Sequence, residues 1–422
     1  MYATLLQRIG PGLLLALVGL VALSTPVVAQ MMCTTGPTFG LQATSGYVLT
    51  PDGNSVFMWG YAPDSGPFQM PGPVLCVNQG QTVTINLTNN LPEPVSIVFP
   101  GQTGVTATGG TAGLLTREAP ASGGTVTYTF TASQPGTYLY ESGTQPHKQV
   151  HMGLYGVLVV RPSMGANFAY NDASTQFSGE FLLVLHEIDP VLHQAVEQGQ
   201  PFNQTLRHDR YWTINGRSMP DLLLDNGSGL LPDQPYGALV RTQANSTLPI
   251  LVRYANAGTV NHPFHPHGNH LKAIAQDGQL LGAAAMETFT RTIAAGQTFD
   301  LLFKWINVEN WRTCTTPPCF TGDPGNGNAL LPVQIPGGLF PPPWGLQDLV
   351  FKDDVTFYSG DPHLGFQGEL PPTVVSFNEC GEFYFPWHSH ALQTVQNFDE
   401  GFGGMNTLVR VDPPAPAVCP VP

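Results

Sequence analysis

The stretch Gln81-Thr82-Val83-Thr84-Ile85-Asn86-Leu87-Thr88-Asn89 alternates polar and apolar residues from Thr82 onward. Successive side chains of a β-strand point to opposite faces, so this alternation predicts a strand with one buried face and one face in water. Threonine, valine and isoleucine favour strands because their branched side chains fit a pleated surface. The stretch therefore predicts a sheet that packs on one side.

Similar runs recur along the chain. Strands are predicted at 125–130, 136–140, 153–160, 180–185, 248–254, 271–275, 298–305, 381–385 and 406–411. The 47 glycines and 40 prolines suit the turns between short strands. A chain of 422 residues is also longer than one hydrophobic core usually organises. We therefore predict an all-β chain with two domains.

Changes in composition set the domain limits. Residues 37–162 predict a first β-sandwich, and 163–176, rich in Asn, Ser, Gly and Ala, predict a linker. A second β domain is expected over 177–412. Within it, a Pro/Gly-rich stretch at about 307–372 predicts a long insertion, because loops of that length are rare inside compact domains. Residues 413–422 predict a Pro-rich tail.

The N-terminus predicts export. Arg8 is followed by an apolar run from Gly12 to Leu23 and then by small residues suited to cleavage before Gln30 or Met31. This pattern indicates a signal peptide at 1–30 and a periplasmic or extracellular protein. A membrane anchor is the alternative, but the apolar run is short for a span. We therefore expect no membrane span in the mature chain.

Charge and cysteine usage fit an exported protein. The net charge of −14 disfavours nucleic-acid binding, because such a surface repels phosphates. The six cysteines favour disulfides over a zinc site in an exported chain. Cys314 and Cys319 could close a small loop. Cys33 with Cys419 and Cys76 with Cys380 would complete three pairs, although sequence alone leaves the connectivity open.

Histidines supply the candidate chemistry. Four of the twelve lie within ten residues, Asn261-His262-Pro263-Phe264-His265-Pro266-His267-Gly268-Asn269-His270, and His388-Ser389-His390 follows downstream. Residues at i and i+2 of a strand share a face, so each His-x-His presents two imidazoles side by side. Neutral imidazole binds copper, zinc, iron and nickel. The pattern therefore predicts a metal site without identifying the metal.

These residues resemble landmarks of the multicopper oxidase family. Matching segments occur in the family's order, at 71–75, 80–83, 136–140, 152–156, 262–268 and 387–390. The resemblance implies two cupredoxin-like Greek-key β-sandwich domains and a copper cofactor. Family members hold a type 1 copper, bound by Cys, two His and often Met, and a trinuclear cluster held by four His-x-His pairs.

The departures from this pattern are as informative as the matches. The expected first-domain pairs fall at 96–101 and 140–143, which contain no histidine, and Ser389 occupies the position of the copper-binding cysteine. A serine hydroxyl does not replace a thiolate as a copper ligand. The resemblance implies that the surviving pairs still face each other and could hold one or two copper ions. These are His265, His267, His388 and His390.

Other polar residues are secondary candidates. His262 matches a type 1 ligand whose partners are gone, and His270 is expected to support the ligands. Glu141 stands where the family has a ligand histidine, so it is a carboxylate ligand, a general base or a strand-end carboxylate bonded to backbone. His147 and His151 follow the lost pair with a spacing that suits a turn. Asp189 before Pro190 predicts a helix N-cap instead of a functional role.

The predicted function is copper binding, with oxidoreductase activity on a small molecule but without a laccase-type electron relay. One alternative is a catalytically silent structural or interaction protein on the same scaffold. Another is copper storage or delivery, which the lack of Met-rich or His-rich tails disfavours. Small two-domain relatives complete their clusters between subunits, so the resemblance also raises a homotrimer as an expectation.

Overall fold

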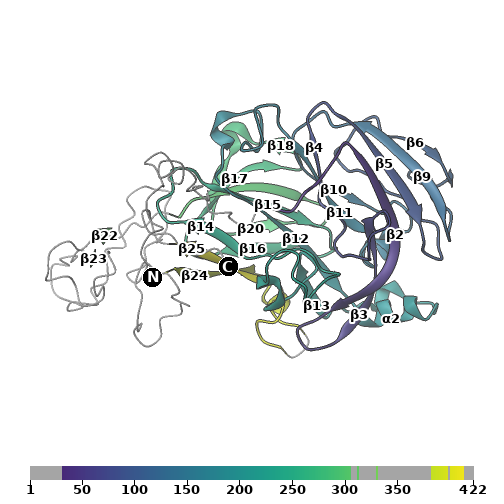
Figure 1. The fold of residues 1–422 in the computed structure, drawn as a ribbon. Helices are drawn as coiled ribbons and strands as arrows, with labels where there is room; N and C mark the ends of the chain where they lie inside the picture. Colours follow the sequence, from purple (N-terminus) through teal and green to yellow (C-terminus); the bar gives the residue numbers. More distant parts are fainter. Residues whose placement is uncertain (1–30, 306–310, 313–328, 331–381, 398–399, 413–422) are drawn as a thin grey trace, which may run out of the picture.

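The computed structural model describes residues 31–305, 311–312, 329–330, 382–397 and 400–412. Within these ranges nearly all regular structure is β, and two sandwiches follow one another along the chain (Figure 1). The predicted all-β fold with two sandwich domains is confirmed. The predicted signal peptide, most of the predicted insertion and the predicted tail lie outside the described residues.

The first sandwich combines a four-stranded sheet, in the order β1-β4-β11-β10, with a five-stranded sheet, in the order β3-β2-β5-β9-β6. A short β7–β8 hairpin stands beside them. The strand bounds are β1 Thr34–Thr35, β2 Thr38–Leu49, β3 Ser55–Pro63, β4 Leu75–Asn78, β5 Thr82–Asn89, β6 Thr106–Gly109, β7 Thr111–Ala112, β8 Arg117–Glu118, β9 Gly124–Thr131, β10 Gly136–Glu141 and β11 Tyr155–Arg161.

The second sandwich combines a sheet in the order β13-β12-β15-β21-β17-β18, with β19 beside β17, and a sheet in the order β14-β25-β24-β16-β20. The strand bounds are β12 Glu180–Ile188, β13 Tyr211–Ile214, β14 Val240–Gln243, β15 Ile250–Asn256, β16 His262–Pro266, β17 Leu271–Gln276, β18 Gln279–Leu280, β19 Met286–Thr288, β20 Arg291–Ile293, β21 Thr298–Phe303, β24 Phe383–Ser389 and β25 Asn406–Asp412. A separate pair joins β22 Trp311–Arg312 to β23 Ala329–Leu330.

Helices are short and connect strands. They are α1 Pro146–Gln149, α2 Pro190–Glu197, and the 3-10 turns η1 Ala173–Thr175, η2 Gln204–Leu206, η3 Asp221–Leu223, η4 Gly282–Ala284 and η5 Leu392–Val395. Asp189 caps α2 by accepting hydrogen bonds from the Val191 and Leu192 amides, so the predicted N-cap is confirmed. Among the described residues, none of these helices has the length and apolar character needed to cross a bilayer.

The alternation that predicted β5 is visible in its burial. Val83, Ile85 and Leu87 are buried in the first core, whereas Thr82 and Asn86 are exposed. The second core has the same character and gathers apolar residues from both of its sheets, including Trp305, Trp387 and Met405. Each sandwich is therefore held by its own apolar interior.

A disulfide corrects one suggestion from the sequence. Cys33 is bonded to Cys76, with an S–S distance of 2.05 Å, so neither cysteine pairs with Cys419 or Cys380. The physical reason is that β1 runs parallel to β4 and places Thr35 opposite Cys76, which brings the two sulfur atoms together. Cys314, Cys319, Cys380 and Cys419 lie outside the described residues.

Buried charges join the two sandwiches. Arg253 of β15 is fully buried and bonds to Glu180 Oε1 at 2.6 Å and to Asp300 Oδ1 at 3.2 Å. Arg161, from the first sandwich, reaches both Glu180 oxygens at 2.6 Å. Thr137 of β10 also accepts a hydrogen bond from Arg253 at 2.8 Å. The two domains are thus connected through a compact ionic cluster.

Gly153 sits in a turn that tolerates no side chain. Its φ is +116°, and a Cβ would lie 2.2 Å from the Trp59 carbonyl oxygen. At Gly80, φ is +84° but nothing lies within 4 Å. We expect Gly80→Ala to cost about 1–2 kcal/mol for the left-handed backbone, and Gly153→Ala to add about 1–3 kcal/mol from overpacking. Urea denaturation of both variants measures this, and equal losses would contradict it.

Candidate metal centre

Two neighbouring strands position the histidine pairs. β16 and β24 are antiparallel, and His265 lies directly opposite His388 in their register. Opposed residues share a face, and residues two positions along the chain point the same way. His267 and His390, each two residues further along, therefore approach the same side of this sheet.

The four imidazoles form one cluster. Ring centroids lie 4.7 Å apart for His265–His267, 5.5 Å for His265–His388 and 5.2 Å for His265–His390. His267 Nε2 is 3.2 Å from His388 Nε2. The ligand nitrogens of His265, His267 and His388 all fall within 4.8 Å of one another, close enough to bind one metal ion. The structure thus brings together all four residues that the sequence singles out.

Hydrogen bonds fix the orientation of two of these rings. His265 Nδ1 donates to the Phe289 carbonyl oxygen at 2.5 Å and lies 2.9 Å from Thr290 Oγ1. His388 Nδ1 donates to the Ser389 carbonyl oxygen at 3.0 Å. With Nδ1 protonated, Nε2 of each ring keeps its lone pair for a ligand, as is usual for metal-binding histidines.

The cluster also favours neutral rings. Burial, followed by repulsion from His265, His388 and His390, lowers the pKa of His267 to about 4. Burial likewise lowers the pKa of His265, although its bond to Phe289 opposes the shift. A neutral imidazole is the form that binds metal, so His265 and His267 are prepared for a cation at neutral pH.

The opposite face of the same strands carries His262 and Ser389, the two residues that the family resemblance places at a type 1 copper site. His262 and Ser389 are fully buried, and His262 Nδ1 lies 3.4 Å from Ser389 Oγ. His262 Nε2 is 4.0 Å from the buried Glu187 carboxylate. Thr259 donates two hydrogen bonds to that carboxylate. Polar side chains thus occupy this position, and none of them supplies a thiolate.

Among the described contacts, three of the secondary candidates have none with the four rings, and one lies beside them. The His270 ring packs against Phe289 at 5.7 Å, next to the cluster. Glu141 ends β10, where burial raises the pKa of its carboxyl group. His147 lies in α1 with an exposed side chain. His151 packs against His186 and His193, with centroids 5.7 Å and 5.3 Å away, instead of joining the four rings.

Sequence reasoning missed two sets of residues. Phe289 and Thr290 orient His265, yet nothing in their local pattern distinguishes them from other loop residues. The buried trio of His151, His186 and His193 was also missed. His151 is 35 residues from His186, and it comes from a different sandwich, so no sequence spacing indicates that they meet. Only packing reveals either set.

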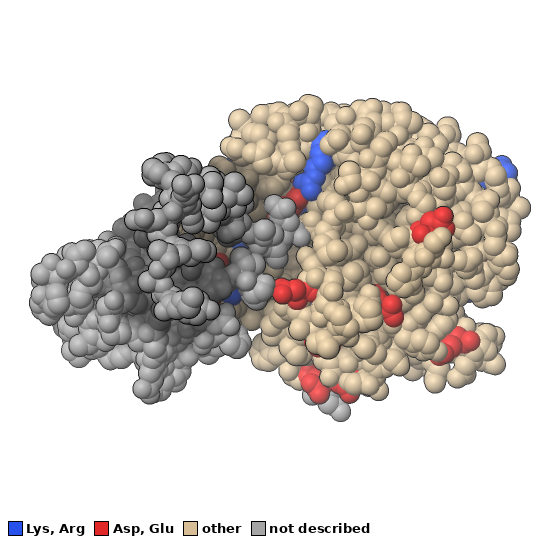
Figure 2. Space-filling model, viewed as in Figure 1, with Lys and Arg blue, Asp and Glu red and all other residues tan. Residues whose placement is uncertain are grey.

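The described surface has few basic side chains. On the face shown in Figure 2, acidic residues are scattered and lysine or arginine is sparse, in keeping with the net charge of −14. Phosphate backbones are bound through clusters of lysine and arginine. This face therefore offers no basic patch of the kind that nucleic acids require.

Comparisons with known proteins agree with this architecture. Residues 63–165 match the family model described as multicopper oxidase. The chain is 26% identical to an L-ascorbate oxidase of Brassica rapa subsp. pekinensis over 254 residues, which is 56% of this chain and 42% of that protein. It is 34% identical to a copper-containing nitrite reductase of Neisseria meningitidis over 99 residues, which is 23% of this chain and 24% of that protein.

Solved structures share the fold. The blue copper oxidase from Nitrosomonas europaea superposes with a TM-score of 0.58 at 18% identity, covering 89% of this chain and 85% of the other. A multicopper oxidase called mgLAC gives a TM-score of 0.57 at 16% identity, covering 91% and 87%. This chain spans less than half the length of the ascorbate oxidase that it matches.

Proposed function

We propose, from the premise that this chain is a divergent member of the multicopper oxidase family, that its four clustered imidazoles bind copper. The observation that supports this most directly is the 3.2 Å separation of His267 Nε2 and His388 Nε2. Two imidazole nitrogens at that distance repel unless a proton or a cation lies between them. A shared cation satisfies both lone pairs and that of His265.

The donor set fits copper. Imidazole nitrogen is a good ligand for Cu(II), which heads the affinity order of the divalent first-row metals. Four imidazoles suffice for one ion, or for two with water or hydroxide completing their shells. When bound, copper would supply one-electron redox chemistry. The protein residues would hold it, and Phe289 and Thr290 would keep His265 Nε2 directed at it.

The proposed activity differs from that of a laccase. Ser389 stands where a type 1 copper needs a thiolate, and its Oγ lies beside His262. Without the thiolate, electrons have no type 1 centre through which to enter. We therefore propose an exported copper protein with oxidoreductase capacity at the His-only site.

Copper loading tests the proposal. Purified protein is incubated with excess Cu(II), desalted and analysed by mass spectrometry for metal and by paramagnetic resonance. We expect about one or two copper ions per chain, nitrogen ligation and no blue thiolate absorption. Replacing both His265 and His388 by Ala should remove most of the copper, because it takes one donor from each strand.

His147→Ala is the matched control, since this exposed histidine lies in α1 of the other sandwich. It should retain the full copper content. The proposal fails if the unaltered protein holds less than about one copper per four chains and the double variant holds the same amount. That result would favour the silent scaffold, which predicts no change in copper content or melting temperature.

A further inference from the structure

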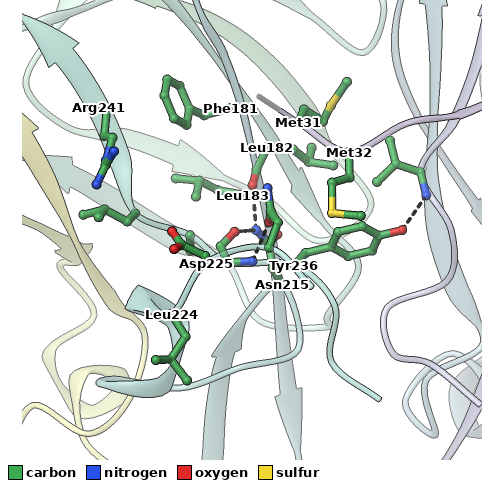
Figure 3. Close-up of a pocket in the computed structure, with 15 residues that line it drawn as sticks. Met31, Met32, Phe181, Leu182, Leu183, Asn215, Leu224, Asp225, Tyr236 and Arg241 are labelled. Atoms are coloured by element: carbon green, nitrogen blue, oxygen red, sulfur yellow. Dashed lines mark hydrogen bonds between the residues drawn. The ribbon is translucent and has the colours of Figure 1, made fainter. Parts of the chain in front are cut away.

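A pocket lies at the seam between the two sandwiches, away from the histidine cluster. The space between its walls is about 550 Å³ when the open solvent at its mouth is included, so the enclosed part is much smaller. Its walls combine an apolar body with a few polar groups, and they include Met31, Met32, Val74, Phe181, Leu182 and Arg241. Figure 3 shows the two methionines on one side and Arg241 on the opposite side, with Leu182 and Leu183 between them. This composition is typical of a small-molecule site.

Arg241 is the unusual member of this lining. Its side chain belongs to β14, and the residue is only 6% exposed. Among the contacts of the described residues, none is a hydrogen bond or a short ion pair to its guanidinium group, although Asp412 and Asp225 attract it from further away. A guanidinium carries five donor hydrogens, and leaving such donors without acceptors in a mostly buried position is costly. The guanidinium group therefore has free donor hydrogens, and a ligand that enters the pocket could supply the acceptor for them.

Other buried arginines nearby do have acceptors. Arg217 donates to the carbonyl oxygens of Gln234, Leu224 and Asp225. Arg410, opposite Arg241 in the β14–β25 register, bonds to Asp412 Oδ1 at 2.7 Å. The fold thus supplies partners for neighbouring guanidinium groups and leaves this one facing the pocket.

The remaining polar groups of the lining are mostly committed. Asn215 uses its side chain to bond Val184, Leu182 and Gly237. The Tyr236 hydroxyl accepts a hydrogen bond from the Val74 amide at 3.2 Å. Asp225 is exposed, so water screens its charge. Arg241 is therefore the main group of the lining that can still form hydrogen bonds with a ligand.

We propose that this pocket binds a small monocarboxylate with an apolar body, its carboxylate paired with Arg241 and its body lying along the apolar wall. A planar carboxylate matches the guanidinium fork, which can donate two parallel hydrogen bonds. The apolar body covers Phe181, Leu182 and Val74, which removes apolar surface from water. This site is separate from the proposed copper centre, so either can exist without the other.

Binding of 3-phenylpropanoate, measured by titration calorimetry with the full chain, tests the proposal. Its uncharged analogue 3-phenylpropan-1-ol is measured in parallel. We expect saturable binding of the acid and at least about tenfold weaker binding of the alcohol, because a hydrogen-bonded charge pair is lost. The site does not exist as proposed if the acid fails to saturate or if the alcohol binds equally well.

Variants locate the binding. Arg241→Gln should weaken the acid at least about tenfold, whereas Arg117→Gln, in β8 of the first sandwich, should have no effect. If Arg241→Gln does not fold, Met32→Trp is tested instead. The indole would fill the mouth of the pocket and block binding of the acid, while the charge of Arg241 stays in place. Unchanged affinity in either blocking variant overturns the proposal.

Discussion

Replacing Arg253 by methionine is expected to lower the free energy of unfolding by about 3–5 kcal/mol, because two buried carboxylates lose their compensating charge. Glu180 is 6% exposed and Asp300 is 2% exposed, so water cannot take the place of the guanidinium. Burial alone would lower the pKa of Arg253, but Glu180 and Asp300 outweigh it and raise that pKa. The charged form is therefore strongly held.

Other residues around the Arg253 ionic cluster show which of the two carboxylates would be affected more. Thr137 donates to Asp300 Oδ1 at 2.5 Å and Tyr170 donates to Asp300 Oδ2 at 2.6 Å. These groups stay after the substitution and cannot neutralise a carboxylate. Arg161 remains on Glu180, so Asp300 becomes the less compensated acid. Adding Asp300→Asn to Arg253→Met should consequently recover part of the lost stability.

Urea denaturation with the disulfide oxidised measures these changes through the midpoint at constant slope. Arg291→Met is the control, since Arg291 stacks on the Phe299 ring, with its Cζ atom 4.2 Å from the ring centroid, and has no carboxylate partner among the described contacts. It should change stability by less than about 1 kcal/mol. A loss below that size for Arg253→Met would show that the cluster contributes little.

Acid is expected to destabilise the protein through the buried trio. His186 and His193 are fully buried. Burial, chiefly, lowers the pKa of His186 to about 4 and that of His193 to about 3. The pKa of His151 is lowered well below its usual range, first by burial and then by His193. The folded state therefore favours neutral rings, whereas the unfolded chain takes up protons near pH 6.5.

The sign follows from that difference. Stability is fully present above pH 6.5 and falls as the pH drops toward the folded pKa values, because the unfolded state binds more protons. For His186 alone the loss approaches about 3 kcal/mol by pH 4. The charged and titratable groups that face the trio are Glu187 of β12, Asp189 before α2, Arg207 and Asp209 before β13, His262 of β16 and Tyr155 of β11.

Two of these carboxyl groups modify the profile. Burial, followed by repulsion from Glu187, raises the pKa of Asp209 to about 6. Its protonation in the folded state below pH 6 therefore offsets part of the histidine effect. Glu187 acts in the opposite direction. Burial opposes its charge, but the nearby His262 ring, His186 and the hydrogen bonds from Thr259 lower its pKa to about 2, so its contribution is lost between about pH 4.5 and 2.

His186→Phe separates the trio from other acid effects. The phenyl ring keeps the contact with Tyr155, whose ring centroid lies 4.6 Å from that of His186, and it cannot take up a proton. Stability measured between pH 8 and pH 4 should fall less steeply in this variant. Tyr155→Phe removes the neighbouring hydroxyl and should leave the slope unchanged, because that hydroxyl does not titrate in acid. Equal slopes for His186→Phe and the unaltered protein would contradict this explanation.

The sequence predicts the local elements well because they depend on local patterns. The alternation at Thr82–Asn89 gives β5, and the Asp189-Pro190 pair gives the cap of α2. The convergence of His265 and His388 was expected from the family resemblance, and it is visible in the strand register. Their binding of copper stays a prediction until metal analysis is done.

Features that depend on long-range packing were not predictable. The Cys33–Cys76 bond follows from the parallel pairing of β1 and β4, which no spacing of cysteines encodes. The contact of His151 with His186 requires the two sandwiches to dock. Arg241 is one arginine among many in the sequence, and only the tertiary contacts reveal that it lacks an acceptor.

Because of the register of β16 and β24, a substitution on one face of this sheet leaves the side chains of the other face in place. Alternate residues of each strand face different surroundings, so the side chain of Ser389 can change on the core side while His388 and His390 keep their direction. A designer could restore or remove one site by single substitutions without moving the other. An insertion of one residue within β16 would instead disturb both sites together, because the side chains beyond the insertion would turn to the other face of the sheet.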